Sequence, residues 1–480
     1  HKFPGGCHII PNHALIILSL LYGEGNFNQT MKIVNTAGWD TDCNSGNIGC
    51  LIGIKSGLRC FEGKNDWRGP IGDIMYCPTA DGSQTITDAL TESYKVIKLA
   101  YKIRGQDFQL PKNGARYNFE MPGALQGWAG TIKNQIESNS FIHLTNVNKN
   151  SIAGKRTLEI AYQLNPNETG KVFTHSFFPE ALTKLEGEQK KTFFSYNFLC
   201  CPQIYSGQTI EVELISDANN EQAVVLCLFV NAYSIGDSKT TLKSELKMLK
   251  PGKTIKFDWV LDVPDSFPIT EVGVEICPNE KNEVAKIYLD YMKISGKPST
   301  KFLRPDHVKP LARGEVPDEK VAVMWRKSWI KACDHWTDRS WEPAFKISNN
   351  KGRGLILTGS SEWCDYSVSS EIKFFLGKSG GVAARVQGLQ RYYALELVND
   401  GTLRLVKVQD GISVLCQCSY LFELNRSYKF EIIVSGSLIK GKINSELMLE
   451  YEDQTKPLLS GAIGLIVESG TIFSDVVEVT

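Results

Sequence analysis

The residues best suited to chemistry stand in the segment Gly38–Asn44, which reads Gly-Trp-Asp-Thr-Asp-Cys-Asn. Asp40 and Asp42 lie two positions apart in a turn that opens a predicted helix, so both carboxylates can point at one hard cation. Asn44 is placed to orient these carboxylates from outside the ligand shell. The spacing therefore predicts a divalent-cation site at the start of a helix.

The same residues also have a purely structural interpretation. Asp42 can cap the helix and Asp40 can occupy the preceding turn, while the glycines that follow serve helix packing. An EF-hand loop is excluded, because its central glycine position holds Ser45 and its bidentate glutamate position holds Leu51. Spacing alone leaves the cation site and the structural interpretation open.

The elements that must position this segment are predicted to be helices. Apolar residues recur at helical spacing up to about residue 105 and predict helices over 13–22, 26–38, 42–57 and 87–103. Asn12 and Asn26 are placed to cap the first two, and Gly23 stands where a C-cap glycine is expected. Residues 1–105 are therefore predicted to form an all-α block.

Four segments of this block resemble a known family in order and spacing. They are His8–Leu15, Leu21–Gly25, Gly38–Asn44 and Gly49–Gly53, and they are similar to the C-terminal third of the ADP-ribosylglycohydrolases. The resemblance covers about residues 1–104 and implies an all-α fold that holds two Mg²⁺ ions. In that family the ions bind the diol of ADP-ribose and activate the water that cleaves its glycosidic bond.

The resemblance implies metal ligation by Asp40, Asp42 and Cys43. Position 43 departs from the threonine common in the family, and a thiol is a poor ligand for a hard Mg²⁺ ion. The family's other ligands and its catalytic glutamate precede this motif, whereas His1–Pro4 contains no carboxylate. We therefore expect a truncated domain with half of the metal site, catalytic residues N-terminal to this chain, and no hydrolysis by this chain alone.

After Arg104 the pattern changes to short alternating runs separated by Gly, Asn, Asp and Pro, which predict antiparallel β-sandwiches. Residues 106–297 resemble the jelly rolls of carbohydrate-binding modules, with an opening strand at 117–121 and a closing strand at 287–294. Trp128 and Trp259 are candidate platforms on which a sugar ring stacks. Packing of both side chains in the core is the alternative.

Residues 298–315 contain three prolines and are predicted to be a linker. The segments Ser361–Tyr366, Gly381–Val386, Arg391–Leu395 and Ser474–Val476 resemble those of a concanavalin-like sandwich, which would span residues 316–480. In this block a type I′ turn is predicted at Asn399–Gly401 and a further tight turn at Asn444-Ser445. A tryptophan cluster near its start either lines a binding groove or forms a seam with the neighbouring sandwich; its members are Trp325, Trp329, Trp336 and Trp341.

A glycosidase needs two carboxylates at a fixed separation. Glu362 with Asp365, and Glu371 with Glu396, are nominal pairs, but the local pattern does not distinguish them from solvated strand residues. Catalysis in the C-terminal block is therefore the weaker interpretation.

The amino-acid composition argues against some classes of binding partner. Lys plus Arg and Asp plus Glu both number 53 among 480 residues, so no net charge attracts nucleic acid or an anionic membrane. No apolar run reaches the length of a membrane span. The 13 cysteines, an odd number without Cys-x-x-Cys spacing, favour buried thiols in a reducing compartment, for which the cytoplasm is preferred, although the sequence leaves the compartment open.

Three hypotheses follow for the parent protein. The first is a Mg²⁺-dependent hydrolase of the ADP-ribosylglycohydrolase type that carries two β-sandwich modules. The second is a glycan- or surface-binding protein whose helical block is a non-catalytic scaffold. The third is a hydrolase that cleaves a different ribosyl substrate.

Overall fold

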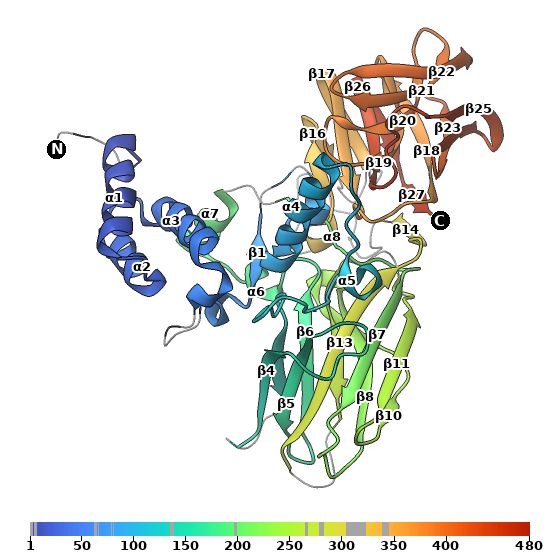
Figure 1. Ribbon diagram of the computed structural model, residues 1–480. Coiled ribbons are helices and arrows are strands. Elements are labelled where there is room, and N and C mark those ends of the chain that lie inside the picture. The colour runs from blue at the N-terminus through green and yellow to red at the C-terminus, as the bar shows by residue number, and fades with distance from the viewer. Residues whose placement is uncertain are drawn as a thin grey trace. The chain divides into compact units, whose positions relative to one another are not determined.

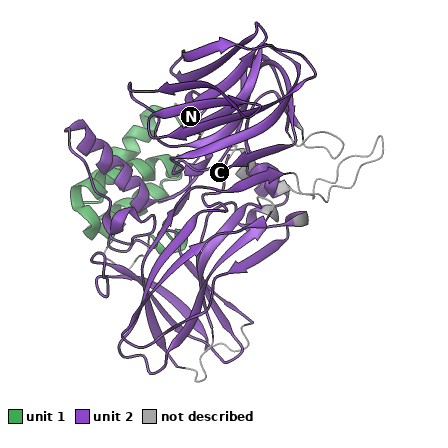
Figure 2. Cartoon of the chain, turned by 90° about the vertical axis from the view of Figure 1, so that its right-hand side faces the viewer, with its two compact units in different colours: residues 1–73 green, residues 74–480 purple. Residues whose placement is uncertain are grey.

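The computed structural model describes Phe3, Asn65, Thr79 and residues 7–61, 67–77, 81–134, 139–195, 199–264, 267–277, 283–303, 323–337 and 345–480. The chain divides into two compact units, residues 1–73 and 74–480 (Figure 2). Each unit has its own apolar core. The units are described separately below.

The first unit is helical, as predicted. Its helices are α1 (Ile9–Tyr22), α2 (Phe27–Thr36) and α3 (Thr41–Ser56), followed by the short turns η1 (Gly57–Phe61) and η2 (Gly69–Ile71) (Figure 1). Asn26 caps α2 as expected, because its side chain accepts a hydrogen bond from the backbone N–H of Gln29. The cap of α1 is His8 instead of Asn12, so this helix begins one turn earlier than predicted.

The fourth predicted helix is α4 (Ala89–Ile103), and it belongs to the second unit. It follows a two-stranded antiparallel sheet of β1 (Ile74–Tyr76) and β2 (Ile86–Asp88), with the turn η3 (Gly82–Gln84) between them. Residues 1–105 are therefore not wholly helical. Strands of three residues are too short to leave a periodic signal, which is why the sequence pattern did not indicate them.

Next along the chain, two antiparallel sheets face each other across a shared apolar core. One sheet has the order β11-β7-β13-β5-β4, and the other has the order β10-β8-β12-β6-β3 with β9 beside β8. The strands are β3 (Ala129–Lys133), β4 (Phe141–Val147), β5 (Thr157–Gln163), β6 (Thr169–His175), β7 (Thr209–Ser216), β8 (Val224–Tyr233), β9 (Lys239–Lys243), β10 (Lys247–Leu249), β11 (Thr254–Val260), β12 (Ile269–Ile276) and β13 (Ala285–Ser295). The short helices α5 (Pro111–Gly114), α6 (Glu180–Thr183) and α7 (Gly187–Ser195) lie in the connections.

The predicted opening strand at 117–121 is absent. Tyr117 makes only an isolated bridge to Met292 on the closing strand β13. Phe119 has a φ of 57°, far from the extended φ of a regular β-strand. The closing strand was predicted correctly.

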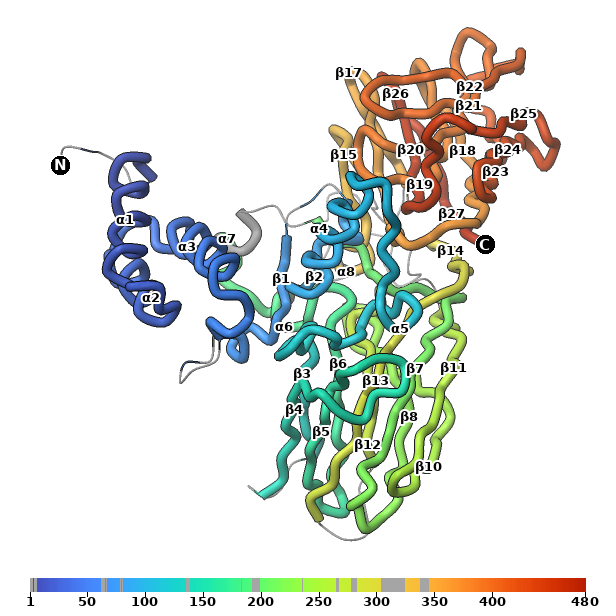
Figure 3. The backbone as a smooth tube through the Cα atoms, in the orientation of Figure 1, coloured from blue at the N-terminus to red at the C-terminus, as the bar shows by residue number. Residues whose placement is uncertain are grey.

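The second sandwich is one continuous hydrogen-bonded sheet with a large apolar core and a second, smaller apolar cluster. Figure 3 shows the course of its backbone. The long strand β26 (Ala462–Ser474) joins its parts, because it pairs with β17 (Phe345–Thr358), β18 (Tyr366–Leu376) and β19 (Ser379–Val386). The remaining elements are α8 (Val323–Lys327), β15 (Ile330–Ala332), β16 (His335–Thr337), β20 (Arg391–Val398), β21 (Thr402–Gln409), β22 (Ile412–Ser419), β23 (Ser427–Ser435), β24 (Leu438–Ile443), β25 (Glu446–Glu452) and β27 (Val476–Val479).

Part of the predicted linker is structured. Thr300–Leu303 form β14, which pairs with β27 at the end of the chain. Residues 304–315, the rest of the predicted linker, lie outside the described residues.

Two predicted hairpin turns differ in type. Asn444 and Ser445 both have positive φ, 50° and 73°, as a type I′ turn requires. At Asn399–Gly401 the prediction of a type I′ turn is wrong, because Val398 pairs with Thr402 and leaves a three-residue loop. In that loop only Gly401 has a positive φ, 82°.

A buried ion pair connects the start of the first sandwich to its closing strand. The Nζ of Lys112 lies 2.7 Å from Oδ1 of Asp290 and 3.3 Å from Oε1 of Glu120. The side chains of Lys112 and Asp290 are fully buried. Burial by itself would raise the pKa of Asp290, but hydrogen bonds from Lys112, Ser151 and the backbone of Ala153 lower it below its ordinary value.

We expect Lys112→Ala to lower the free energy of unfolding by about 3 to 5 kcal/mol, because it leaves buried carboxylates without their cation. Urea denaturation followed by circular dichroism measures this loss. Lys155→Ala, which removes an exposed lysine from the loop beside this ion pair, is the control and should change stability by less than about 0.5 kcal/mol. Equal losses in both variants would contradict the role of Lys112.

Candidate functional site

Buried aromatic side chains join the two sandwiches of the second unit. The rings of Tyr205, from the first sandwich, and Trp363, from the second, meet edge to face with centroids 4.6 Å apart. Phe302 packs in the same way on Trp329, at 5.2 Å. Trp325 and Trp336 are also buried in this cluster. These three tryptophans are therefore buried and do not line an open groove, and Phe302 connects them to Tyr205 of the first sandwich. Trp341 lies outside the described residues.

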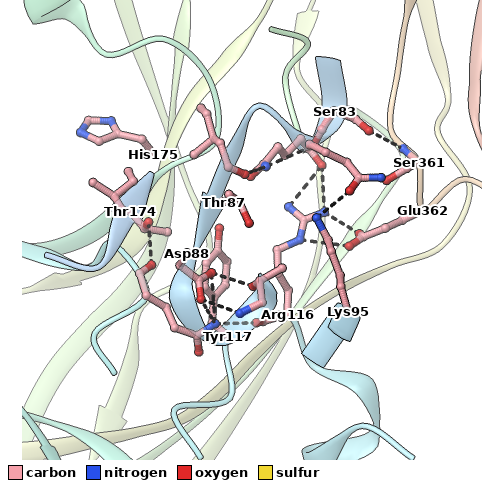
Figure 4. Close-up of a pocket in the computed structure, with 16 residues that line it drawn as sticks. Ser83, Thr87, Asp88, Lys95, Arg116, Tyr117, Thr174, His175, Ser361 and Glu362 are labelled. Carbon is pink, nitrogen blue, oxygen red and sulfur yellow. Dashed lines mark hydrogen bonds and ion pairs between the residues drawn. The ribbon is translucent and has the colours of Figure 1, made fainter. Parts of the chain in front are cut away.

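A pocket of about 150 Å³ lies beside this seam (Figure 4). Three parts of the sequence line it: the segment from β1 to the first turns of α4, the first sandwich, and the loop of the second sandwich that precedes Trp363. The lining residues are Ile74, Ser83, Gln84, Ile86, Thr87, Asp88, Thr91, Lys95, Arg116, Tyr117, Gln126, Thr174, His175, Gln203, Ser361 and Glu362.

The start of α4 supplies one wall of the pocket. Asp88 is the N-cap of this helix, and its carboxylate accepts hydrogen bonds from the backbone N–H of Thr91 at 2.9 Å and from its hydroxyl at 2.7 Å. One turn later, the Nζ of Lys95 donates to Oε1 of Gln84 at 2.6 Å and to Oε1 of Glu92 at 2.7 Å. Capping thus fixes the helix start and directs Lys95 along the pocket wall.

Arg116 connects the first sandwich to the loop of the second. Its guanidinium donates two hydrogen bonds to the carboxylate of Glu362, at 3.2 Å and 2.5 Å, and two longer ones to the carbonyl oxygen of Gln203. Burial would lower the pKa of Arg116, but the charge of Glu362 raises it above its ordinary value. Arg116 is therefore a permanent cation that holds Glu362 at the pocket.

Two further titratable groups in the wall are neutral near pH 7. Burial raises the pKa of Tyr117, although the nearby charge of Arg116 opposes this. Burial lowers the pKa of His175, against the opposing charge of Glu271. Lys95 and Arg116 each pair with a carboxylate, so the pocket presents paired charges, amides and hydroxyls, a lining suited to a neutral polar ligand.

The predicted metal ligands come together in the first unit. Asp40, Asp42 and Cys43 each present a ligand atom, and these atoms lie within 4.8 Å of one another. Asp40 is the N-cap of α3, a place predicted for Asp42, but its side chain makes no capping hydrogen bond. Its carboxylate accepts hydrogen bonds from the amide of Asn12 and from the thiol of Cys7 instead.

The thiol of Cys43 is unsuited to a hard cation. A hydrogen bond to Asp40, together with the negative charges of Asp40 and Asp42, raises its pKa. Cys43 is therefore protonated at neutral pH, and the two carboxylates are the ligands that fit Mg²⁺, which commonly takes one or two from a protein and keeps several waters.

The two candidate sugar platforms lie toward the core of the first sandwich. Trp128 is only 2% exposed and packs edge to face against Tyr117 and Phe119, so neither face of its ring is open to a sugar. Core packing therefore describes Trp128 correctly. Trp259 is partly buried and packs against the same core from β11, where Ile255 and Phe257 share its side of the strand.

Three of the four nominal glycosidase carboxylates are engaged in ion pairs, and the fourth, Glu371, is exposed on β18. Glu362 pairs with Arg116, and Asp365 pairs with the fully buried guanidinium of Arg385. Glu396 is fully buried between Arg353 and Arg404. These contacts position loops and strands. The expectation of a solvated strand residue is wrong for Glu396, because two arginines pair with its buried carboxylate.

Sequence reasoning missed most of the pocket. Asp88 carried a signal, since an aspartate directly before an apolar helical stripe is a typical N-cap. Arg116 and Gln203 carried none, because their role depends on contacts with residues far along the chain.

No family model matches the chain, and no curated protein matches it. Among solved structures, similar ones are carbohydrate-binding modules and galectin-like β-sandwiches. The carbohydrate-binding module CBM66 from Bacillus subtilis is 20% identical, with 31% of this chain and 94% of that chain covered and a TM-score of 0.29. The CBM22-1 xylan-binding domain from Paenibacillus barcinonensis Xyn10C is 10% identical, with 37% and 90% covered and a TM-score of 0.24.

Sheep galectin-11 is 12% identical, with 26% of this chain and 96% of that chain covered and a TM-score of 0.22. TM-scores of this size carry no conclusion about this chain, whose sandwiches are defined by their own strand pairing. The resemblance of residues 1–104 to the ADP-ribosylglycohydrolases gains no support from these comparisons and stays an expectation.

The helices within the described ranges include none that is both long and apolar enough to cross a membrane.

The hydroxyl of Tyr205 fixes the loop that carries Ser361 and Glu362 into the pocket. It accepts a hydrogen bond from the backbone N–H of Gly359 at 2.9 Å and lies 3.2 Å from the hydroxyl of Thr358. We expect Tyr205→Phe to lower the free energy of unfolding by about 1 to 3 kcal/mol, because the buried N–H of Gly359 loses its acceptor.

Thermal and urea denaturation measure this effect. The matched control is Tyr420→Phe, which removes a hydroxyl bonded to Asn444 at the exposed edge of the second sandwich and should cost less than about 0.5 kcal/mol. A Tyr205→Phe protein as stable as the parent would contradict the assigned role.

Proposed function

We propose that this chain is a glycan-binding protein and that the pocket beside the aromatic seam holds a neutral sugar residue. The observation that carries the proposal is the convergence of hydrogen-bonding side chains from three distant parts of the sequence on one pocket. A concave site with convergent polar groups is where a small ligand is expected.

The chemistry of the wall fits a ligand rich in hydroxyl groups. The ammonium group of Lys95 donates, the carboxylates of Asp88 and Glu362 accept, and the hydroxyls of Thr87 and Thr91 do both. A sugar hydroxyl also donates and accepts at once, so it complements such a lining without adding charge. The pocket is smaller than the ~300 Å³ of the smallest typical ligand sites, which favours one sugar residue over a longer chain.

Isothermal titration of the full chain with a panel of neutral monosaccharides and short oligosaccharides tests the proposal. We expect Lys95→Ala to weaken binding of the sugar that binds the parent protein by about tenfold, since one charge-assisted hydrogen bond is worth about 1.5 kcal/mol or more. Lys98→Ala is the matched control, because Lys98 lies on the same helix but does not line the pocket.

The possible results of this titration lead to different conclusions. Unchanged binding by Lys98→Ala with weakened binding by Lys95→Ala supports the pocket as the site. Equal binding by both variants places sugar binding elsewhere, and failure of the whole panel to bind contradicts the glycan-binding function.

The carboxylate pair of the first unit favours a second candidate function, the binding of Mg²⁺ in a hydrolase of the ADP-ribosylglycohydrolase type. Asp40 and Asp42 would hold the ion. A bound Mg²⁺ ion supplies Lewis-acid polarisation of ribose hydroxyls and a water of lowered pKa. In this chain Asn12 orients the carboxylate of Asp40 by donating a hydrogen bond to it.

Titration with Mn²⁺, a paramagnetic substitute for Mg²⁺, tests the cation site by electron paramagnetic resonance. We expect the double variant Asp40→Asn/Asp42→Asn to lose at least tenfold in Mn²⁺ affinity, because both anionic ligands are gone. Glu24→Gln, an exposed carboxylate of the same unit, should bind Mn²⁺ as the parent does. Equal affinity of all three proteins would contradict the cation site.

A further inference from the structure

Helix α1 exposes a continuous apolar stripe along its whole length. Every residue of the stripe is exposed. Successive members of the stripe are alternately one and three positions apart in the sequence, so they follow one face of the helix. The stripe consists of Ile9, Ile10, Ala14, Ile17, Leu18, Leu21 and Tyr22, with the polar side chain of His13 among them. Its large members are strongly exposed, for example Ile9 at 72% and Leu21 and Tyr22 at 69%.

The opposite face of α1 is the one that packs within the unit. Ser19 is fully buried there, and Ile16 and Leu20 contact the core residues that α2 and α3 supply. The helix thus has two apolar faces, of which its own unit covers one. A helix that is apolar all round is typical of a buried element, so the exposed stripe marks an interaction surface.

The absence of charged side chains on α1 indicates which kind of binding partner this surface suits. Residues Ile9–Tyr22 contain no lysine, arginine, aspartate or glutamate. A two-fold contact brings the same patch of both copies together. A patch with charged residues would then place like charges opposite each other, whereas an uncharged stripe meets its own copy without repulsion. The stripe is complementary to itself.

The exposed area is near what a dimer requires. Its six large side chains, each about half exposed or more, offer roughly 600 Å² in one copy, compared with about 800 Å² for each partner of a standard interface. Burial by both copies would remove roughly 1,200 Å² in total, the lower end of stable interfaces, which suits a weak and reversible dimer.

We propose that a second copy of this chain docks on the α1 stripe, so that two first units pair through their α1 helices. The contact is apolar and two-fold. It therefore persists at high salt, unlike an association through surface ion pairs.

Sedimentation velocity of the full chain over a range of micromolar concentrations, at low and at high salt, tests this inference. The expected result is a monomer–dimer equilibrium that high salt does not weaken. The double variant Ile17→Asp/Leu21→Asp should raise the dimer dissociation constant at least tenfold. The control, Leu99→Asp, puts the same charge on an apolar residue of α4 that is 61% exposed and should leave the equilibrium unchanged.

A second variant controls for the possibility that the double variant weakens the dimer by unfolding α1. Ile9→Glu adds a negative charge at the first residue of α1, where the helix dipole favours it, so the variant should keep the fold and still weaken the dimer. A parent protein that is monomeric throughout, or a dimer unaffected by Ile9→Glu and by the double variant, would overturn the inference.

Discussion

The second unit depends on the burial of the aromatic seam between its two sandwiches. Tyr205 comes from the first sandwich, and Trp329 and Trp363 come from the second. Phe302 lies on β14, which pairs with β27 of the second sandwich, and its ring contacts both Tyr205 and Trp329. These edge-to-face contacts remove large apolar surfaces from water. Without this seam, no apolar packing would hold the part of the chain that carries Arg116 against the loop that carries Glu362. With it, their ion pair forms at a fixed place, and the loop that carries Glu362 closes one side of the pocket.

The pocket also depends on interactions that fix the neighbouring elements. The buried ion pair of Lys112 and Asp290 attaches the segment before Arg116 to the closing strand β13. Capping by Asp88 fixes the start of α4 and with it the position of Lys95. Each of these polar interactions is satisfied within the protein, so the wall is rigid before a ligand arrives, which lowers the entropy cost of binding.

The two units offer different chemistry. In the second unit, each cation of the pocket wall is paired with a carboxylate, which suits recognition of hydroxyl groups more than proton transfer. In the first unit, Asp40 and Asp42 are two carboxylates at the start of α3, and the protonated thiol of Cys43 leaves them as the hard ligands. The helices around them carry an apolar stripe that their own unit does not cover.

The sequence by itself determined the local structure. Each of these local features depends on residues that are close together in the sequence. They are the cap at Asn26, the glycine after α1, the alternation that predicted β13 and the tight turn at Asn444-Ser445. The juxtaposition of Asp40 with Asp42 was predictable for the same reason. Only the tertiary structure decided that Trp128 is buried and that Phe119 interrupts the predicted strand at 117–121. It also decided that Asp88, Arg116 and Glu362 share one pocket. Arg116 and Glu362 lie 246 residues apart along the chain, and only the packing of whole sheets brings their side chains within hydrogen-bond distance.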